Sequence, residues 1–219
     1  QLSGCIPAEF GELAQIIEIN LSDNQLGCVI PQELGNLANL ETLRLSGNQL
    51  IGPIPQNLNN LSSLQSLSLS YNALYTADGA LDAFLDSVSP DNWSATQTVA
   101  PDNITVTPNG GESATVTWDP IEFTAESGRY RVGYSDSPAG PYESAGTTSD
   151  KSTTALFVDG LPPNKTYYFA VSTETDPHGS NQNLVVSDDS NVGAAFVELI
   201  NEETSFEIAS DYLTDPDPF

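Results

Sequence analysis

A 24-residue period in the first third of the chain limits its fold more than any other feature. Three blocks superpose when Leu2, Leu26 and Leu50 are aligned, and together they span residues 2–73. Each block carries the pattern L-x-x-L-x-x-L-x-L-x-x-N-x-L, with Ile in place of Leu at two positions of the first block. A period of this length predicts a solenoid, in which each coil buries its apolar face only against neighbouring coils.

Three columns of the repeat have a readable physical role. One apolar pair per block alternates as in a short strand with two side chains inward, so stacked coils should form a parallel sheet. The Asn that follows each strand can satisfy main-chain groups of the bend, and the Asn residues should form a ladder from coil to coil. A Pro on the opposite side of each coil suits a turn, because it fixes φ and lacks a donor. The residues are Ile19 and Leu21, Leu43 and Leu45, Leu67 and Leu69 for the strands, Asn24, Asn48 and Asn72 for the ladder, and Pro7, Pro31 and Pro55 for the turns.

The blocks resemble plant-type leucine-rich repeats, because each carries an I-P pair, and the second continues with L-G-x-L at Leu34 to Leu37. That subclass occurs in plant receptors and in bacterial surface proteins. Binding through such repeats uses the concave strand face, which is the recognition surface that the resemblance implies. A plain solvated face is the alternative, because three coils are too few to curve around a ligand. The candidate binding residues on this face are Glu18, Asn20, Thr42, Arg44, Ser66, Ser68 and Tyr71, of which Arg44 and Tyr71 are hot-spot residue types.

The two ends of the repeat differ. After Leu74 the pattern stops, and apolar residues then recur at mostly helical spacing, which predicts a C-terminal cap at about residues 75–98. We expect Trp93 to cover the last coil. The first coil has no polar capping sequence before it, so either further repeats precede it or another surface stacks on its apolar edge. The repeat domain is therefore placed at residues 1–98.

Two cysteines lie within the repeats. Cys5 and Cys28 are one residue short of a full period apart, which puts them at neighbouring positions of adjacent coils. Coils stack at roughly 5 Å, within the Cα separation that a disulfide spans. A disulfide and a pair of buried free thiols both remain open on this evidence.

Residues 99–198 have a different pattern, with about seven short alternating runs separated by Pro, Gly, Asp and Asn. Such runs predict an antiparallel β-sandwich. This segment resembles a fibronectin type III domain, with Trp118 in the place of the core tryptophan of the second strand and G-L-P-P-N-K-T-Y-Y-F-A-V at residues 160–171. The resemblance implies that Tyr167 forms a tyrosine corner by bonding back to the main chain. The predicted fold class is thus multidomain, a leucine-rich repeat solenoid followed by an all-β sandwich.

The last segment, residues 199–219, belongs to neither unit and combines acidic with apolar residues. It either begins another domain or supplies an assembly strand to a neighbouring molecule. Ca²⁺ binding has weak support from Asp188, Asp189, Asp215 and Asp217, which lack the twelve-residue loop pattern. The candidate assembly residues are Leu199, Ile200, Phe206, Ile208, Tyr212 and Leu213.

Charge and residue types exclude several functions. Thirty Asp and Glu stand against five Lys and Arg, for a formal charge of -25, which argues against binding to nucleic acids. No apolar run approaches the roughly 18 residues that a membrane-spanning helix needs, so no membrane insertion is expected within these residues. His178, the one histidine, is expected to be exposed in a loop. We find no convergent catalytic set and predict no enzyme, no cofactor and no metal centre.

Both types of domain are typical of extracellular proteins, and their combination resembles bacterial secreted or surface proteins more than a plant receptor. The favoured function is a non-enzymatic adhesion or protein-interaction module of a larger extracellular or cell-surface protein. Its partner would be a protein or a glycan at the cell surface. One alternative is a structural subunit of an extracellular filament or surface layer, bound to copies of itself through the uncapped repeat edge or the C-terminal tail. Another is an accessory segment of a secreted hydrolase.

Overall fold

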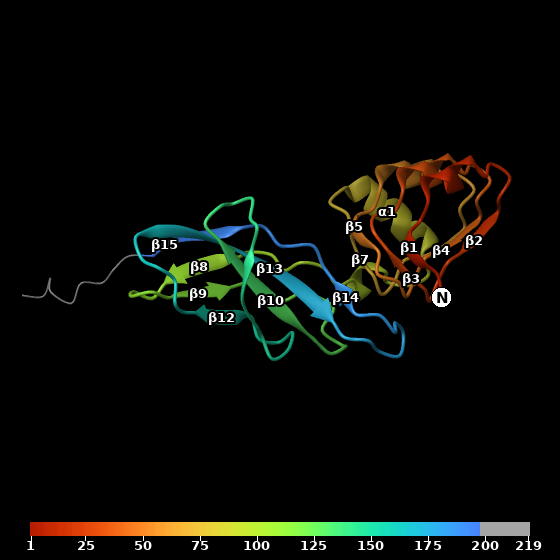
Figure 1. The fold of residues 1–219 in the computed structure, drawn as a ribbon. Coiled ribbons are helices and arrows are strands. Elements are labelled where there is room, and N and C mark those ends of the chain that lie inside the picture. Colours follow the sequence, from red (N-terminus) through yellow and green to blue (C-terminus); the bar gives the residue numbers. More distant parts are fainter. Residues whose placement is uncertain (198–219) are drawn as a thin grey trace, which may run out of the picture.

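The computed structural model describes residues 1–197, which form a solenoid and a β-sandwich that lie next to each other (Figure 1). Each unit has its own apolar core. The solenoid core runs from Ile6 to Trp93, and the sandwich core runs from Ala114 to Val197. The predicted fold class is therefore confirmed. The candidate assembly residues of the tail, from Leu199 to Leu213, and the candidate Ca²⁺ ligands Asp215 and Asp217 lie outside the described residues.

The coils of the solenoid pair through short parallel strands. The central sheet contains β2 (Glu18–Asn20), β4 (Thr42–Arg44) and β6 (Ser66–Ser68), with Ile19, Leu43 and Leu67 in register and buried. Two further pairs of parallel strands stack beyond the bend of each coil, and these are β1 (Ser3–Cys5) with β3 (Gln25–Gly27) and β5 (Ile51–Pro53) with β7 (Ala73–Tyr75). The parallel sheet expected from the alternating leucines is thus present.

The opposite side of each coil is a single turn of 3₁₀ helix that begins after the proline of the I-P pair. The prolines have φ between -66° and -67°, which is their preferred value and suits the residue before a helix. Gly11 and Gly35 are needed for stacking, because a Cβ at either position would overlap the carbonyl group of the next coil. The three helices are η1 (Ala8–Glu12), η2 (Gln32–Asn36) and η3 (Gln56–Asn60).

The predicted asparagine ladder is confirmed. The Oδ1 atom of Asn48 accepts from the main-chain N–H of Leu26 at 3.0 Å, and its Nδ2 donates to the carbonyl of Leu45 at 3.0 Å. Asn24 and Asn72 make the same bonds in their own coils. Asn48 and Asn72 are fully buried. Each side chain therefore supplies hydrogen-bond partners to main-chain groups that water cannot reach.

A fourth rung ends the ladder. The Oε1 atom of Gln97 accepts from the N–H of Leu74 at 3.0 Å, and its Nε2 donates to the carbonyls of Leu69 and Trp93 at 3.1 and 2.9 Å. Gln97 therefore replaces the asparagine of the other coils. The repeat pattern did not reveal this residue, because it is a glutamine and lies 25 positions after Asn72 instead of 24.

A helix and a buried tryptophan close the C-terminal end of the solenoid. Helix α1 (Gly79–Val88) begins at Asp78, whose carboxylate accepts from the N–H groups of Ala80 and Leu81. These two bonds hold the pKa of Asp78 below its usual value. Trp93 precedes a short 3₁₀ helix (η4, Ser94–Thr96) and is 2% exposed within the solenoid core. It covers the last coil as expected.

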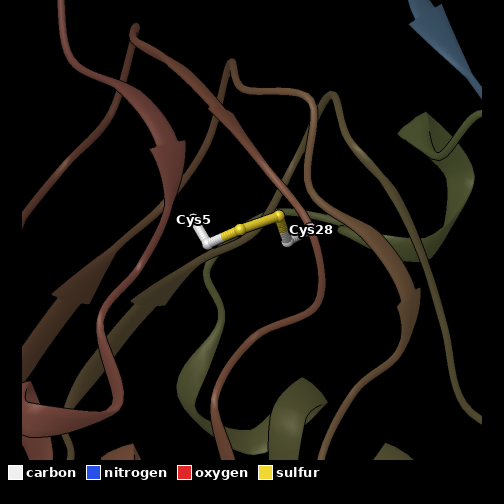
Figure 2. Close-up of a disulfide and its surroundings, with 2 residues drawn as sticks. All are labelled: Cys5 and Cys28. Carbon is white, nitrogen blue, oxygen red and sulfur yellow. A yellow bond between two sulfur atoms is a disulfide. The ribbon is translucent and has the colours of Figure 1, made fainter.

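A disulfide joins the first two coils (Figure 2). Cys5 and Cys28 have Cα atoms 5.3 Å apart, and no other cysteine occurs in the chain. Cys28 has a φ of 63°, in a column where the other coils carry Gly4 and Gly52 with φ of 89°. The bond fixes the first described coil to the second.

The sandwich contains two antiparallel sheets around a core that includes Trp118 and Tyr130. The phenol oxygen of Tyr167 donates to the carbonyl of Pro162 at 3.0 Å, which confirms the predicted tyrosine corner. One sheet has the order β12 (Ala155–Val158), β9 (Ala114–Thr117) and β8 (Thr105–Pro108). The other contains β11 (Glu143–Thr147), β10 (Gly128–Ser135) and β13 (Lys165–Thr175), with β14 (Val185–Val186) and β15 (Gly193–Val197) both paired to β13.

The last part of the sandwich, residues 184–197, contains two short strands with an irregular segment between them. Strands β14 and β15 are separated by residues 187–192, which leave the regular ladder. The hydroxyls of Ser187 and Ser190 accept from the N–H groups of Thr173 and Val171, both at 2.9 Å. Because serine hydroxyls replace carbonyl partners here, Asp188 and Asp189 can turn outward without leaving strand β13 unpaired.

Candidate functional site

The strands of the central repeat sheet bring six of the seven candidate binding residues onto one face. Parallel pairing puts Glu18, Thr42 and Ser66 in one row and Asn20, Arg44 and Ser68 in the next. All six are exposed or half-buried. The face is therefore an open, polar surface whose side chains are held in fixed register by the coils beneath them.

Arg44 is engaged within this face. Its Nη1 atom lies 2.7 Å from Oε1 of Glu18 on the neighbouring strand. Both side chains remain substantially exposed, so water and salt screen the pair and a ligand can compete for either partner.

Tyr71, the seventh candidate, does not lie on the strand face. It follows β6 in a bend with a φ of 60°, and its ring packs edge-to-face against His178 and Phe123 of the sandwich, with centroids 5.4 and 6.0 Å apart. The expectation that His178 is an exposed loop residue is wrong, because its side chain is only 6% exposed. The loop that carries His178 folds onto the solenoid, which sequence spacing alone does not predict.

A tight turn after β13 reaches the solenoid and binds its bends. His178 and Asn181 exchange main-chain hydrogen bonds of 2.7 and 3.2 Å, which close the turn. The Nδ2 atom of Asn181 donates to the carbonyls of Asn48 and Tyr71 at 2.8 and 2.9 Å. The side chain thus spans the second and third coils.

Asn183 makes the corresponding contact one coil earlier. Its Nδ2 atom donates to the carbonyl of Asn24 at 2.7 Å and lies 3.4 Å from that of Gly47. The Oδ1 atom of Asn181 accepts from both the N–H and the side-chain amide of Asn183, at 2.9 and 2.8 Å, so the two amides orient each other. We call Asn181 and Asn183 the clamp. Both are buried, and they give main-chain carbonyls of three successive bends a partner from the sandwich.

The turn that carries the clamp can approach the second coil only where that coil has no side chain. The column of residues just before the ladder asparagines contains Asp23, Gly47 and Tyr71, all with φ between 56° and 68°. A Cβ at Gly47 would lie 2.5 Å from Oδ1 of Asp23 and 3.3 Å from the carbonyl oxygen of Ser180. The absence of a side chain at Gly47 therefore lets the turn approach the solenoid.

A second contact lies where the chain passes from one unit to the other. The hydroxyl of Thr98 donates to that of Thr175 at 2.7 Å, directly after the last rung of the ladder at Gln97. Thr175 also lies 3.2 Å from Nζ of Lys151, which donates to the carbonyl of Phe123 at 2.8 Å. Burial lowers the pKa of Lys151 to about 8, against the opposing influence of Glu126 and Asp176. No free linker separates the two units.

The strand face and the turn enclose a polar cleft of about 930 Å³. Its floor is formed by the hydroxyl-rich ends of the strands, including Ser46 and Ser68, and its far wall by the cap segment at Asp91 and Asn92. Residues 179–183 of the sandwich form the remaining wall. Sequence reasoning missed Asn181 and Asn183, because two asparagines at alternate positions in a turn give no sign of what they contact.

Two further kinds of feature, a group of metal-ligating side chains and a membrane-spanning helix, are not found among residues 1–197. Within residues 1–197, no three His, Cys, Asp or Glu side chains group in a way that holds a metal ion, Asp188 and Asp189 included. None of the helices in this part of the chain is long and apolar enough to cross a membrane.

Family comparisons agree with this architecture. The leucine-rich repeat family matches residues 6–50, and the fibronectin type III domain family matches residues 99–187. The chain joins leucine-rich repeats to a fibronectin type III domain. Domains of these two types are non-catalytic interaction modules, typical of receptor and surface proteins.

Solved structures resemble the two parts separately. The repeats are 46% identical to the ectodomain of the plant receptor kinase GASSHO1/SCHENGEN3 from Arabidopsis thaliana, in complex with CASPARIAN STRIP INTEGRITY FACTOR 2, over 33% of this chain and 9% of that one, with a TM-score of 0.33. They are 44% identical to the plant peptide hormone receptor RGFR1 in complex with RGF2, over 34% and 12%, with a TM-score of 0.33.

A third structure resembles the fibronectin type III part. It is an Fn3-like protein from Clostridium thermocellum, 21% identical over 47% of this chain and 96% of that one, with a TM-score of 0.37. The chain spans only 9% and 12% of the two receptor ectodomains. A search of the curated proteins gave no match.

Proposed function

We propose that this chain is a non-enzymatic interaction module of a larger extracellular or cell-surface protein, which binds a protein or glycan at the strand face of its repeats. The observation that carries the proposal is the open row of polar side chains on β2, β4 and β6, held in register by the parallel sheet. A rigid, exposed set of this kind supplies directed hydrogen-bond groups with little ordering cost on binding.

Two features support an extracellular setting. The Cys5–Cys28 disulfide is of the kind that persists in oxidising compartments. Both types of domain are common in receptor and surface proteins. In this proposal the fibronectin type III domain fixes the orientation of the repeats relative to the rest of the parent protein.

The test is a screen of purified secreted proteins, surface proteins and glycans with the whole chain immobilised. A strand-face variant, Thr42→Arg with Ser66→Arg, places two long side chains among the candidate residues. The control is Gln32→Arg with Asn36→Arg, which makes the same change of charge on the exposed opposite side of the second coil. The proposal predicts a ligand whose binding is lost in the strand-face variant and kept in the control. No ligand, or equal loss in both variants, contradicts it.

A second candidate is assembly with copies of the same chain through the first coil. Leu2, Leu13 and Ile17 are 55%, 47% and 60% exposed at this edge, and strand β2 has a partner on one side only. Exposed apolar side chains beside the open edge of a strand favour edge-to-edge association. Sedimentation across a hundredfold range of concentration tests this candidate. Concentration-dependent growth that Ile17→Lys abolishes supports it, and a constant monomer mass rejects it.

A further inference from the structure

We propose that the cleft between the repeats and the fibronectin type III turn binds a peptide segment that carries lysine or arginine side chains. The inference rests on the proposed function, because it names a ligand class for an interaction module. It adds a site that neither domain forms alone, since the repeats supply the floor and residues 179–183 supply one wall.

The size and chemistry of the cleft suit a peptide. Its volume of about 930 Å³ lies near the upper end of the range of roughly 300–1,000 Å³ that is typical of ligand pockets, and the cleft is open to solvent, so a peptide can lie along it. Its lining includes the side-chain amides of Asn92 and Gln182 together with the hydroxyls of Ser46 and Ser68. These groups can pair with the N–H and C=O groups of a peptide main chain, directly or through water.

The charge of the cleft selects basic side chains. Asp23 comes from the first coil and Asp91 from the cap, so two different segments of the chain each bring a carboxylate to the cleft. Both are exposed, and neither takes part in any ion pair of residues 1–197. No lysine or arginine lines the cleft. A cationic side chain would therefore find partners whose charge is not already compensated.

The same features disfavour a glycan. Sugar binding uses exposed aromatic rings as stacking platforms, and Tyr71 is the one aromatic residue that lines the cleft. Its ring already packs against His178 and Phe123 of the neighbouring domain. The net charge of -25 also attracts a basic peptide at a distance and speeds its association.

The clamp gives this cleft a fixed width. Asn181 and Asn183 hold the turn on the solenoid through carbonyls of three coils, directly beside the cleft that both residues also line. A preformed site of this kind loses little free energy to ordering when a peptide enters. Peptide binding should accordingly leave the relative position of the two domains unchanged.

The experiment is a selection of phage-displayed random 12-residue peptides on the whole chain, followed by titration of the enriched peptides at low and high salt. The test variant is Asp23→Asn with Asp91→Asn, which removes two charges and keeps the shape of the side chains. The matched control is Asp82→Asn with Asp86→Asn, which makes the same change of charge on the exposed face of helix α1. NMR spectra of each variant verify the fold.

We expect enriched peptides to contain Lys or Arg and to shift the amide signals of Gly47 and Ser180. Their affinity should fall about tenfold in the test variant, as expected for two lost charge contacts of moderate strength, and change less than twofold in the control. Failure to enrich basic peptides overturns the proposal, as does equal weakening in both variants. The screen of folded proteins and glycans remains a separate test, because a ligand lost in the strand-face variant would support the proposed function even if this cleft binds no peptide.

Discussion

The side-chain amide of Asn181 in the fibronectin type III domain donates to the main-chain carbonyl of Asn48, a buried rung of the ladder, at 2.8 Å. Asn48 thus bonds to its own repeats through its side chain and to the neighbouring domain through its main-chain carbonyl. With Asn183 bonded to Asn24 in the preceding coil, the contact follows the stacking direction of the solenoid. We infer that the two domains behave as one unit.

Without the clamp, the two domains should unfold at different temperatures. We expect Asn181→Ala with Asn183→Ala to cost about 1–3 kcal/mol per side chain, because main-chain carbonyls lose buried partners. Calorimetry should then resolve two unfolding transitions where the parent chain gives one. Asn109→Ala, in an exposed turn remote from the repeats, is the control and should leave a single transition. A single, unshifted transition in the double variant would argue against the clamp.

Gly47→Ala should be more harmful than its backbone conformation alone explains. Gly47 and Gly160 have nearly the same φ, 68° and 69°, but only Gly47 has atoms where a Cβ would stand. Both substitutions carry the left-handed penalty of about 1–2 kcal/mol. Gly47→Ala must also displace the Asp23 carboxylate and the turn at Ser180, which adds about 1 kcal/mol of side-chain strain. Urea unfolding of the two variants measures the difference, and equal losses would contradict the close approach.

The pH dependence of stability should report the buried ammonium of Lys151. Its pKa in the folded chain is about 8, below the usual 10.5, because burial disfavours the charged form. Between these two values the unfolded chain binds more protons than the folded chain, so this residue makes stability rise with pH and adds nothing further above 10.5. Below pH 8 both states are protonated, and the full penalty of the buried charge remains.

The measurement is the free energy of unfolding of the parent and of Lys151→Met from pH 7 to 10.5. The parent should gain stability relative to this variant as pH rises through that window. Lys165→Met is the control, because the carboxylate of Asp136 raises the pKa of this exposed lysine above its usual value, in the opposite direction to the shift of Lys151. Parallel curves for the parent and Lys151→Met would show that Lys151 does not titrate there.

Gln97 should matter as much as a ladder asparagine. Gln97→Ala leaves the buried N–H of Leu74 without its partner, at a cost of about 1–3 kcal/mol if that group stays dry. The carbonyl of Leu69 loses one of its two donors and keeps the side-chain amide of Asn72. Gln65→Ala, at an exposed position of the third coil, should change the unfolding free energy by less than about 0.5 kcal/mol. Chemical denaturation compares the two, and a Gln97→Ala effect no larger than the control would remove Gln97 from the ladder.

The repeat fold was predictable because its information is periodic. The columns that contain Leu43 and Asn48 recur in every coil, so the sequence shows three times which positions face the core. Gln97 was not predictable, because it is not an asparagine and does not lie at the 24-residue spacing. The tyrosine corner of Tyr167 was predictable for another reason, since its partner lies only five residues away in the same motif.

The contact between the domains was not predictable. Asn181 and Asn48 are separated by 133 residues, and no local pattern connects a turn of one fold to the bends of another. For the same reason Tyr71 was assigned to the strand face and His178 to solvent. The repeat pattern places Tyr71 outside the core of the solenoid, and its turn places His178 outside the core of the sandwich, but neither pattern shows that the two rings meet.

Residual dipolar couplings of the whole, isotopically labelled chain test the central claim that the clamp joins the two domains into one rigid unit. Couplings from the repeats and from the fibronectin type III domain should fit a single alignment tensor of the same magnitude and orientation, with the domains placed as in Figure 1. In Asn181→Ala with Asn183→Ala the two tensors should diverge. Two tensors of different magnitude in the parent chain would show that the domains move independently and that the clamp does not join them into one unit.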